Sequence, residues 1–344
     1  MASRLESIEI GMSGQWPVPA VVACAREAER CGMPRFWVAE NYYARSLSIL
    51  ATAVCQATQR IDVGLGVVNP FTRRAPLIAM ETATLDELSG GRVTLAVGAG
   101  RMPANHLGLD QSRTITLLRE TVEICRRLFA GETLGYPGAV HRIPPGAIRL
   151  AVRPARGASL PIYLGTMGPK GQRLGGEIAD GVFLSVFTSP AFARDARAQI
   201  EAGLRQSGRT LAGFYFGAYA LFAVDRDPRV ARDLVRPTVT DYLGRHLATE
   251  RLVAAGIDAE RATGVRGRVQ EALRRGDTEE ALRLVPDDFC DRLAVCGTPE
   301  DCCAALHALA EAGLQSVTAY NMLGRDPVEA IRLIATEIVP HVCA

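Results

Sequence analysis

The sequence lacks the features that mark nucleic-acid-binding, membrane and secreted proteins. Its formal net charge at pH 7 is +2 over 344 residues, so no basic excess points to a nucleic acid or an anionic membrane surface. No apolar run reaches the length that spans a bilayer, and no apolar signal-peptide core is recognisable. We therefore expect a small-molecule partner and neither a nucleic-acid nor a membrane partner.

Metal-binding and nucleophile motifs are also missing. The nine cysteines include no CxxC pair and lie mostly at apolar helical positions, which favours buried thiols in a reducing cytoplasm over disulfides or zinc. The chain has no HxH or HExxH spacing, no GxSxG elbow and no Walker sequence. No metal site is expected, so any chemistry would come from a bound cofactor.

What the sequence does contain is a regular alternation of apolar and amphipathic segments. Several apolar segments are continuous, as expected for strands covered on both faces. Eight such strands with helices between them favour a (β/α)8 TIM barrel over an open doubly wound sheet. The predicted strands are residues 7–12, 35–39, 61–68, 93–98, 162–165, 181–186, 214–224 and 316–322.

Two segments are too long for one strand and one helix. Residues 130–159 are rich in glycine and proline, which indicates a long excursion after the fourth helix. Residues 225–288 are polar and helical without a strand candidate, and we interpret them as a helical insertion between strand seven and its barrel helix. With this insertion, residues 1–344 are expected to form a single barrel domain.

The C-terminal strand ends, where active sites of such barrels collect, carry glycines and neutral polar residues suited to a flat heteroaromatic ligand. Residues 64–73 and 161–170 give the clearest signal, because each apolar strand runs into glycine and breaks at proline. Each stretch alone also fits an ordinary turn between a strand and a helix. The strand ends include Gly11, Glu40, Asn41, Val67, Val68, Asn69, Gly98, Ala99, Gly100, Arg101, Ser185, Phe187, Tyr320 and Asn321, with His106 the only histidine near them.

The fifth strand predicts a phosphate site. Gly165 ends this strand, and Pro169 fits the first turn of a helix, where its missing N–H costs nothing. The amides of Thr166, Met167 and Gly168 would then be free to hold a phosphate, aided by the helix dipole. Lys170, the only lysine, would add charge or point into solvent.

Five ordered motifs resemble those of one known group of proteins: NPFTR at 69–73, ATLDELSGGR at 83–92, GAG at 98–100, GTMGPK at 165–170 with GEIADG at 176–181, and GTPED at 297–301. They resemble the bacterial-luciferase-like superfamily, and within it the methylenetetrahydromethanopterin reductase branch that depends on the deazaflavin coenzyme F420. The resemblance covers roughly residues 8 to 340. It implies a (β/α)8 barrel, usually a homodimer, with F420 or FMN at its C-terminal mouth.

The resemblance also assigns roles by position. Val67 and Val68 would form a bulge behind the cofactor ring, where this family often has a non-prolyl cis peptide. Glu40 stands where relatives have an acidic residue that contacts the ring, and Asn41 beside it is the second catalytic candidate. The remaining cofactor candidates are Asn69, Gly98, Ala99, Gly100, Gly165, Thr166, Met167, Gly168, Pro169 and Lys170.

Two departures from the family pattern bear on the reaction. Several F420-dependent dehydrogenases of the superfamily follow the acid with a catalytic histidine, where this chain has Asn41. Some place a carboxylate after the strand-four glycines, where this chain has Arg101. The chain thus lacks the pair that handles the proton of an alcohol, which favours hydride transfer at a C=N or C=C bond. Arg101 would bind an anionic substrate or the acidic cofactor tail, or be a solvated charge; Gly11 and His106 are the other substrate candidates.

The leading hypothesis is therefore an F420-dependent oxidoreductase that acts on a small organic substrate. The alternative is an FMN-dependent monooxygenase that uses reduced flavin and dioxygen. A third reading is a barrel that binds a cofactor without turnover.

Overall fold

The computed structural model describes residues 3–100 and 107–344, which divide into two compact units. The first, here called the N-terminal unit, comprises residues 9–184 and 196–217. The second, the C-terminal unit, comprises the chain up to residue 8 together with residues 185–195 and 218–344. Arg101 and His106, two of the substrate candidates, lie outside the described residues.

Parallel strands and helices alternate as the sequence predicts. The strands pair in the order β1-β2-β3-β4-β7-β8, β8 pairs with β9, and β11 lies between β9 and β1, so the eight strands form a closed (β/α)8 barrel. The fold-class prediction is confirmed, and every predicted strand end lies within two residues of the observed one. The barrel strands are β1 (Ser7–Ser13), β2 (Arg35–Ala39), β3 (Asp62–Val68), β4 (Val93–Gly98), β7 (Ile162–Gly165), β8 (Gly181–Leu184), β9 (Tyr215–Val224) and β11 (Ser316–Leu323).

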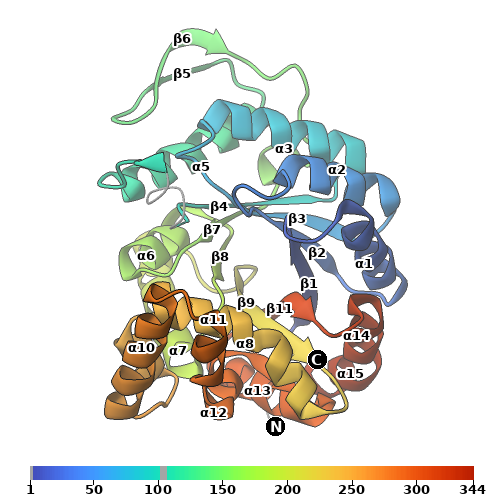
Figure 1. Ribbon diagram of the computed structural model, residues 1–344. Helices are drawn as coiled ribbons and strands as arrows, with labels where there is room; N and C mark the ends of the chain where they lie inside the picture. Colours follow the sequence, from blue (N-terminus) through green and yellow to red (C-terminus); the bar gives the residue numbers. More distant parts are fainter. Residues whose placement is uncertain (1–2, 101–106) are drawn as a thin grey trace. The chain divides into compact units, whose positions relative to one another are not determined.

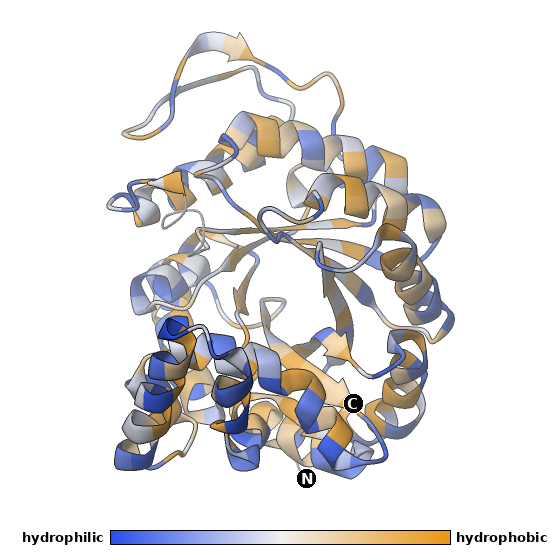
Figure 2. Ribbon diagram, in the orientation of Figure 1, coloured by the Kyte–Doolittle hydropathy of each residue, from blue (hydrophilic) through white to orange (hydrophobic). Residues whose placement is uncertain are grey.

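Helices follow most of these strands and cover them (Figure 1). Their first turns carry the expected signals: α1, α3, α6 and α13 have proline in the first turn, and Thr298 and Asp301 form a reciprocal capping box on α13. The strands are largely apolar in Figure 2, as strands covered on both faces should be. The helices of the barrel are α1 (Val18–Arg30), α2 (Leu47–Ala57), α3 (Ala75–Ser89), α5 (Thr114–Phe129), α6 (Pro169–Ile178), α7 (Pro190–Gln206), α13 (Pro299–Glu311) and α14 (Pro327–Leu333), with η2 (Ile334–Ile338) and α15 (Val339–Val342) after α14.

The two long segments contain more structure than the sequence pattern indicates. The excursion at 130–159 holds an antiparallel hairpin (Figure 1) that is tied to α5 by the hydrogen bond from the Tyr136 hydroxyl to Glu123 at 2.5 Å, followed by a short 3-10 turn. The hairpin was not predicted from the sequence because the Pro144-Pro145-Gly146 run in its second strand is typical of a loop. The hairpin strands are β5 (Leu134–Pro137) and β6 (Arg142–Ile148), and the 3-10 turn is η1 (Gly157–Ser159).

Residues 225–288 are helical, as predicted for the insertion. A three-residue strand, too short to leave a periodic signal, follows them and pairs with β9. That the whole chain is one domain stays a prediction. The segment contains α8 (Pro228–Arg245), α9 (Thr249–Ala254), α10 (Ala259–Arg274), α11 (Thr278–Arg283) and the start of α12 (Asp287–Leu293), and the added strand is β10 (Val295–Gly297).

Inside the N-terminal unit, a buried ion pair fills the space between the strands. Glu9 of β1 is 2% exposed and accepts from Arg35 Nη1 at 2.8 Å and from Trp37 Nε1 at 2.5 Å. The Arg35 guanidinium lies 5.5 Å from the ring centroid of Tyr215 and 5.7 Å from that of Tyr163, and these two rings stack at 4.4 Å. Burial opposes the Arg35 charge, but Glu9 together with Tyr163, Tyr215 and Asp62 more than offsets the effect of burial, so the pKa of Arg35 is raised and the cation persists.

The same cluster explains one glycine. A Cβ on Gly64 of β3 would lie 2.2 Å from the Trp37 ring, which stacks on Phe183 at 4.6 Å between centroids. Only glycine leaves room for the indole between neighbouring strands at this position. This part of the barrel is therefore filled by side chains.

The 83–92 motif holds the fold together rather than forming a site. Asp86 is fully buried and accepts from Val93 N at 3.1 Å and from Ala155 N at 2.8 Å. Arg92 donates to the backbone carbonyls of Cys55, Thr58, Ile61 and Ser89 at 2.6–3.1 Å. Both side chains fasten loops at the N-terminal ends of β3 and β4, where barrel residues serve stability.

Candidate functional site

The candidate site is built on the C-terminal strand ends of the N-terminal unit, and Val67 is its central residue. The peptide bond between Gly66 and Val67 is cis, and the register of β3 against β4 shifts between Gly66 and Val68. Val67 is thus the extra residue of a bulge. The backbone irregularity expected at Val67 and Val68 is present.

The bulge turns the Val67 side chain onto two glycines of neighbouring strands. A Cβ on Gly165, the last residue of β7, would lie 2.3 Å from Val67 Cγ1, and a Cβ on Gly98, the last residue of β4, would lie 2.9 Å from Cγ2. Contacts this short are not tolerated, so both positions require glycine while valine stands at 67. The ends of β3, β4 and β7 therefore meet in one close-packed wall, here called the valine–glycine wall.

Asn69 holds this wall in place through hydrogen bonds of its side chain and its carbonyl. Its side chain is 1% exposed, donates from Nδ2 to the Ala99 carbonyl and accepts from Phe71 N at 2.8 Å. Its carbonyl accepts from Arg73 N at 3.1 Å. The Asn69 amide thus ties the loop after β3 to the end of β4, and a direct contact of Asn69 with a cofactor stays a prediction.

Glu40 follows β2, and its side chain is held by two donors. Its side chain is 13% exposed and accepts from Arg73 Nη1 and from the Tyr42 hydroxyl, each at 3.3 Å. Burial, with the Glu40 charge beside it, raises the pKa of Tyr42 to about 12, so this phenol remains a donor at neutral pH. An arginine and a phenol thus fix one carboxylate at the strand end.

The ion pair extends outward to the helices. Arg73 Nε lies 3.2 Å from Glu81 Oε1 on α3, and Ser48 of α2 donates to the other oxygen of Glu81 at 2.8 Å. The sequence analysis gave no role to Tyr42 or Arg73. Arg73 belongs to the 69–73 motif, but spacing alone does not show that it pairs with an acid from the preceding strand.

The two remaining candidates of this part differ in position. Asn41 is half-buried beside Glu40, and no hydrogen bond joins its side chain to the residues that the structure describes. Tyr43 after it has φ of 63° and is 69% exposed. Gly11 is buried within β1 beside Trp37, two residues before the end of that strand at Ser13. Asn41 is thus better placed than Gly11 to meet a ligand.

The loop between β7 and α6 corrects one expectation. Thr166 N donates to the Phe183 carbonyl of β8 at 3.1 Å, so its amide is not free for a phosphate. Its hydroxyl instead packs on the first turn of α6, 2.1 Å from where a Cβ on Gly171 would stand. The backbone pairing between neighbouring strands, which the sequence does not show, uses this donor.

The entrance of α6 nevertheless retains the properties of an anion site. Gly168 is the N-cap, has an extended backbone with φ of −99°, and a Cβ built on it would meet nothing within 4 Å. Pro169 takes the first helical position, and the amides of Lys170 and Gly171 in that first turn have no intrahelical acceptor. Gly168, Pro169 and Lys170 are all exposed, so an anion can approach them, whereas Met167 is half-buried.

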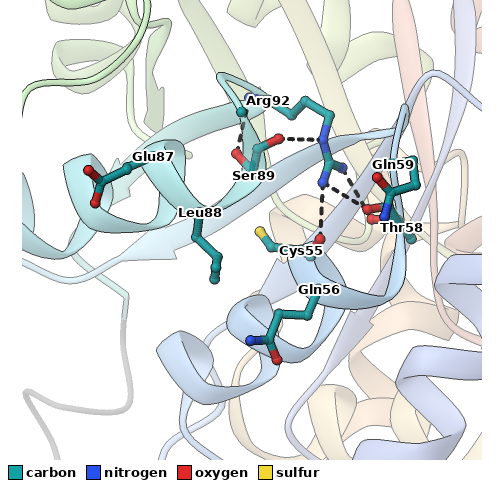
Figure 3. A pocket seen from close by; sticks show the side chains of 9 residues that line it. Cys55, Gln56, Thr58, Gln59, Glu87, Leu88, Ser89 and Arg92 are labelled. Atoms are coloured by element: carbon teal, nitrogen blue, oxygen red, sulfur yellow. Dashed lines mark hydrogen bonds between the residues drawn. The ribbon is translucent and has the colours of Figure 1, made fainter.

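A surface hollow of about 630 Å³ lies elsewhere in the N-terminal unit (Figure 3). It is bordered by the ends of α2 and α3 and by Arg92, at the N-terminal ends of β3 and β4, away from the strand ends that carry Glu40 and Val67. Figure 3 shows the Arg92 donors engaged with backbone and side-chain oxygens, so they are not available to a ligand. The hollow is not the site.

Metal ligation and membrane insertion receive no support. Among residues 3–100 and 107–344, no group of three histidine, cysteine or carboxylate side chains is placed to hold a metal ion. Over the same residues, none of the helices is both long and apolar enough for a membrane span.

Comparison with known proteins adds the family context. The model of the luciferase-like monooxygenase family matches residues 7–316. A 5,10-methylenetetrahydromethanopterin reductase from Archaeoglobus fulgidus is 31% identical over 91% of this chain and 92% of its own length. One from Methanolobus tindarius is 30% identical over 94% and 96%. A solved coenzyme F420 dependent tetrahydromethanopterin reductase from Methanopyrus kandleri is 27% identical, covers 99% of this chain and all of its own, and has a TM-score of 0.90.

The valine–glycine wall makes a prediction about stability. Gly165→Ala should lower stability by about 1–3 kcal/mol, because the new methyl group overlaps Val67 Cγ1. In a Val67→Ala background the loss should largely disappear, since the Val67 Cβ would be 3.4 Å away. Thermal unfolding of the parent, the two single variants and the double variant measures this coupling.

Gly168→Ala is the matched control, because its Cβ would enter open space. It should leave the melting temperature near that of the parent. Additive losses in the Gly165 and Val67 variants would show that the two residues do not meet.

Proposed function

The chain belongs to the luciferase-like monooxygenase family, and we propose that within it the protein is an oxidoreductase that transfers a hydride between coenzyme F420 and a small organic substrate. The observation that carries the proposal is the valine–glycine wall together with Glu40, which Arg73 and Tyr42 hold, and an open helix entrance at Gly168. The names of the methanopterin reductase relatives, one of them F420 dependent, support the same cofactor.

The residues present fit this cofactor. Gly98 and Gly165 carry no side chains, so the ends of β4 and β7 beside Val67 leave a surface on which a flat ring can lie. The α6 entrance offers amide donors and the positive end of a helix dipole to a phosphate, with the exposed Lys170 nearby. When bound, coenzyme F420 would supply a ring carbon that carries the hydride, at the position where FMN has a nitrogen.

The side chains that could exchange a proton with the substrate limit the kinds of reaction that we propose for the site. Glu40 is held by Arg73 and Tyr42 and offers a fixed negative charge beside the wall. Asn41 offers an amide, which orients a polar group but does not take up a proton at neutral pH. A base for an alcohol proton is thus missing at this position. We propose a substrate with a C=N or C=C bond, and 5,10-methylenetetrahydromethanopterin is the first compound to test.

We also propose that the protein is a homodimer in a reducing cytoplasm. Four of the exposed large apolar residues of the N-terminal unit lie on two helices in contact, Ile49 on α2 and Leu77, Met80 and Leu88 on α3, each 44–66% exposed. Apolar side chains gathered on one helical face are typical of an interaction surface. All nine cysteines are free thiols, which fits a reducing compartment.

The first prediction of the proposed function concerns cofactor affinity. Gly168→Val should weaken binding of oxidised coenzyme F420 about tenfold or more, because the branched side chain fills the space at the α6 entrance. Lys170→Ala should weaken it by about 1 kcal/mol or less, as expected for an exposed charge. A fluorescence titration measures both, and the melting temperatures should match the parent. Parent-like binding by the Gly168 variant would show that this loop is an ordinary turn.

The second prediction concerns turnover. Oxidation of reduced F420 by 5,10-methylenetetrahydromethanopterin, followed by absorbance, should proceed with the parent and fall at least about tenfold in kcat with Glu40→Gln. The loss follows from the fixed charge beside the wall, which the amide does not supply. Glu87→Gln, an exposed position on α3, is the matched control. A Glu40→Gln variant that loses thermal stability but keeps kcat would assign Glu40 to the fold alone.

The third prediction concerns assembly. A Leu77→Glu, Met80→Glu double variant should elute as a monomer, because two charges on one face oppose burial of that face. Light scattering coupled to size exclusion gives the mass of the parent and the variant. Val253→Glu changes an exposed apolar residue of α9 and should stay dimeric. A monomeric parent would contradict the proposal.

A further inference from the structure

The C-terminal unit holds a strained residue directly after β8. Phe187 has φ of 62° and is 6% exposed. A left-handed conformation is uncommon outside glycine, asparagine and aspartate, and for a bulky aromatic residue it persists only where the surroundings fix it. Phe187 stands in the loop between β8 and α7, at the C-terminal end of a barrel strand, where barrels place substrate-contacting residues.

Arg251, from α9 of the helical insertion, fixes this residue. Its Nη2 donates to the Phe187 carbonyl at 3.0 Å. Its guanidinium carbon lies 3.5 Å from the ring centroid of Phe192 on α7. A guanidinium over a ring face adds a cation–π attraction to the hydrogen bond. One side chain thus joins the strained carbonyl to the first turns of the helix that follows the loop.

A second helix of the insertion holds the Phe187 ring. The Tyr242 ring of α8 lies 4.6 Å from it at 51°, within the range of favourable aromatic pairs. His246, one turn later on α8, stands edge-on to Tyr242 at 5.3 Å. The insertion therefore holds both groups of Phe187: α9 holds its carbonyl, and α8 holds its ring.

We propose that Arg251 is a positioning residue for the substrate: by holding Phe187 in its left-handed conformation, it lets the helical insertion shape the substrate-facing loop after β8. Without the guanidinium, the strained backbone loses its hydrogen-bond partner, and the loop relaxes. The substrate then meets an altered surface at this loop, whereas the valine–glycine wall proposed for the cofactor contains none of the residues that Arg251 contacts. This inference rests on the proposed function and names the element that would determine substrate affinity.

The test uses Arg251→Ala and Arg251→Lys in the full chain. Arg261→Ala is the matched control, because Arg261 also pairs with its partners through hydrogen bonds, at 2.5 Å to Asp288, and lies over a ring, at 5.3 Å from Phe289. With 5,10-methylenetetrahydromethanopterin, Arg251→Ala should raise KM about tenfold or more. Its kcat and its Kd for oxidised F420 should stay within about threefold of the parent, and Arg251→Lys should be intermediate.

Hydrogen exchange provides a readout that needs no substrate. The amides of residues 186–190 should exchange faster in Arg251→Ala and at the parent rate in Arg261→Ala. Unchanged exchange there, or a loss of F420 affinity equal to the rise in KM, would overturn the inference. If the parent does not reduce the pterin, the proposed substrate is wrong. The exchange of this loop then decides on its own whether Arg251 holds Phe187.

Discussion

The contact of Val67 with Gly98 and Gly165 is the constraint on which the candidate site depends. One extra residue in β3 places a branched side chain where two neighbouring strands would carry Cβ atoms, so both strands must end in glycine. The three strand ends can then lie close enough to form a flat wall. Asn69 keeps the loop after β3 against the end of β4, and the next turn brings Arg73 to Glu40. Wall and carboxylate are thus positioned by one local irregularity of the chain.

In the N-terminal unit, the residues that stabilise the fold lie in the interior and at the N-terminal strand ends, and the candidate site lies at the C-terminal strand ends. Glu9, Arg35 and their surrounding rings fill the interior with mutually paired groups, and Asp86 and Arg92 fasten the loops at the N-terminal strand ends. Replacing one partner of such a buried pair leaves an uncompensated charge, which is strongly destabilising. The opposite strand ends carry the half-buried Gly165, a half-buried amide at Asn41 and an open helix entrance at the exposed Gly168. These groups are available to ligands because the fold does not use them.

The sequence pattern predicted the barrel because its information is local: apolar segments of strand length, several of them continuous, mark all eight strands, and glycine followed by proline marks the α6 entrance. Contacts between residues far apart in the chain were not predicted. The Thr166 amide is used by the Phe183 carbonyl, Arg73 pairs with an acid 33 positions earlier, and Arg251 reaches a carbonyl 64 positions away. Spacing rules carry no signal for such contacts. The hairpin β5–β6 was missed for a local reason, since its proline pair imitates a loop.

The central claim is that this wall holds a deazaflavin rather than FMN, and a parallel titration of the purified protein with oxidised coenzyme F420 and with FMN tests it most directly. The account predicts saturable, micromolar or tighter binding of F420 and markedly weaker binding of FMN. Micromolar binding of FMN alone would contradict it and would favour the flavin monooxygenase chemistry after which the family is named.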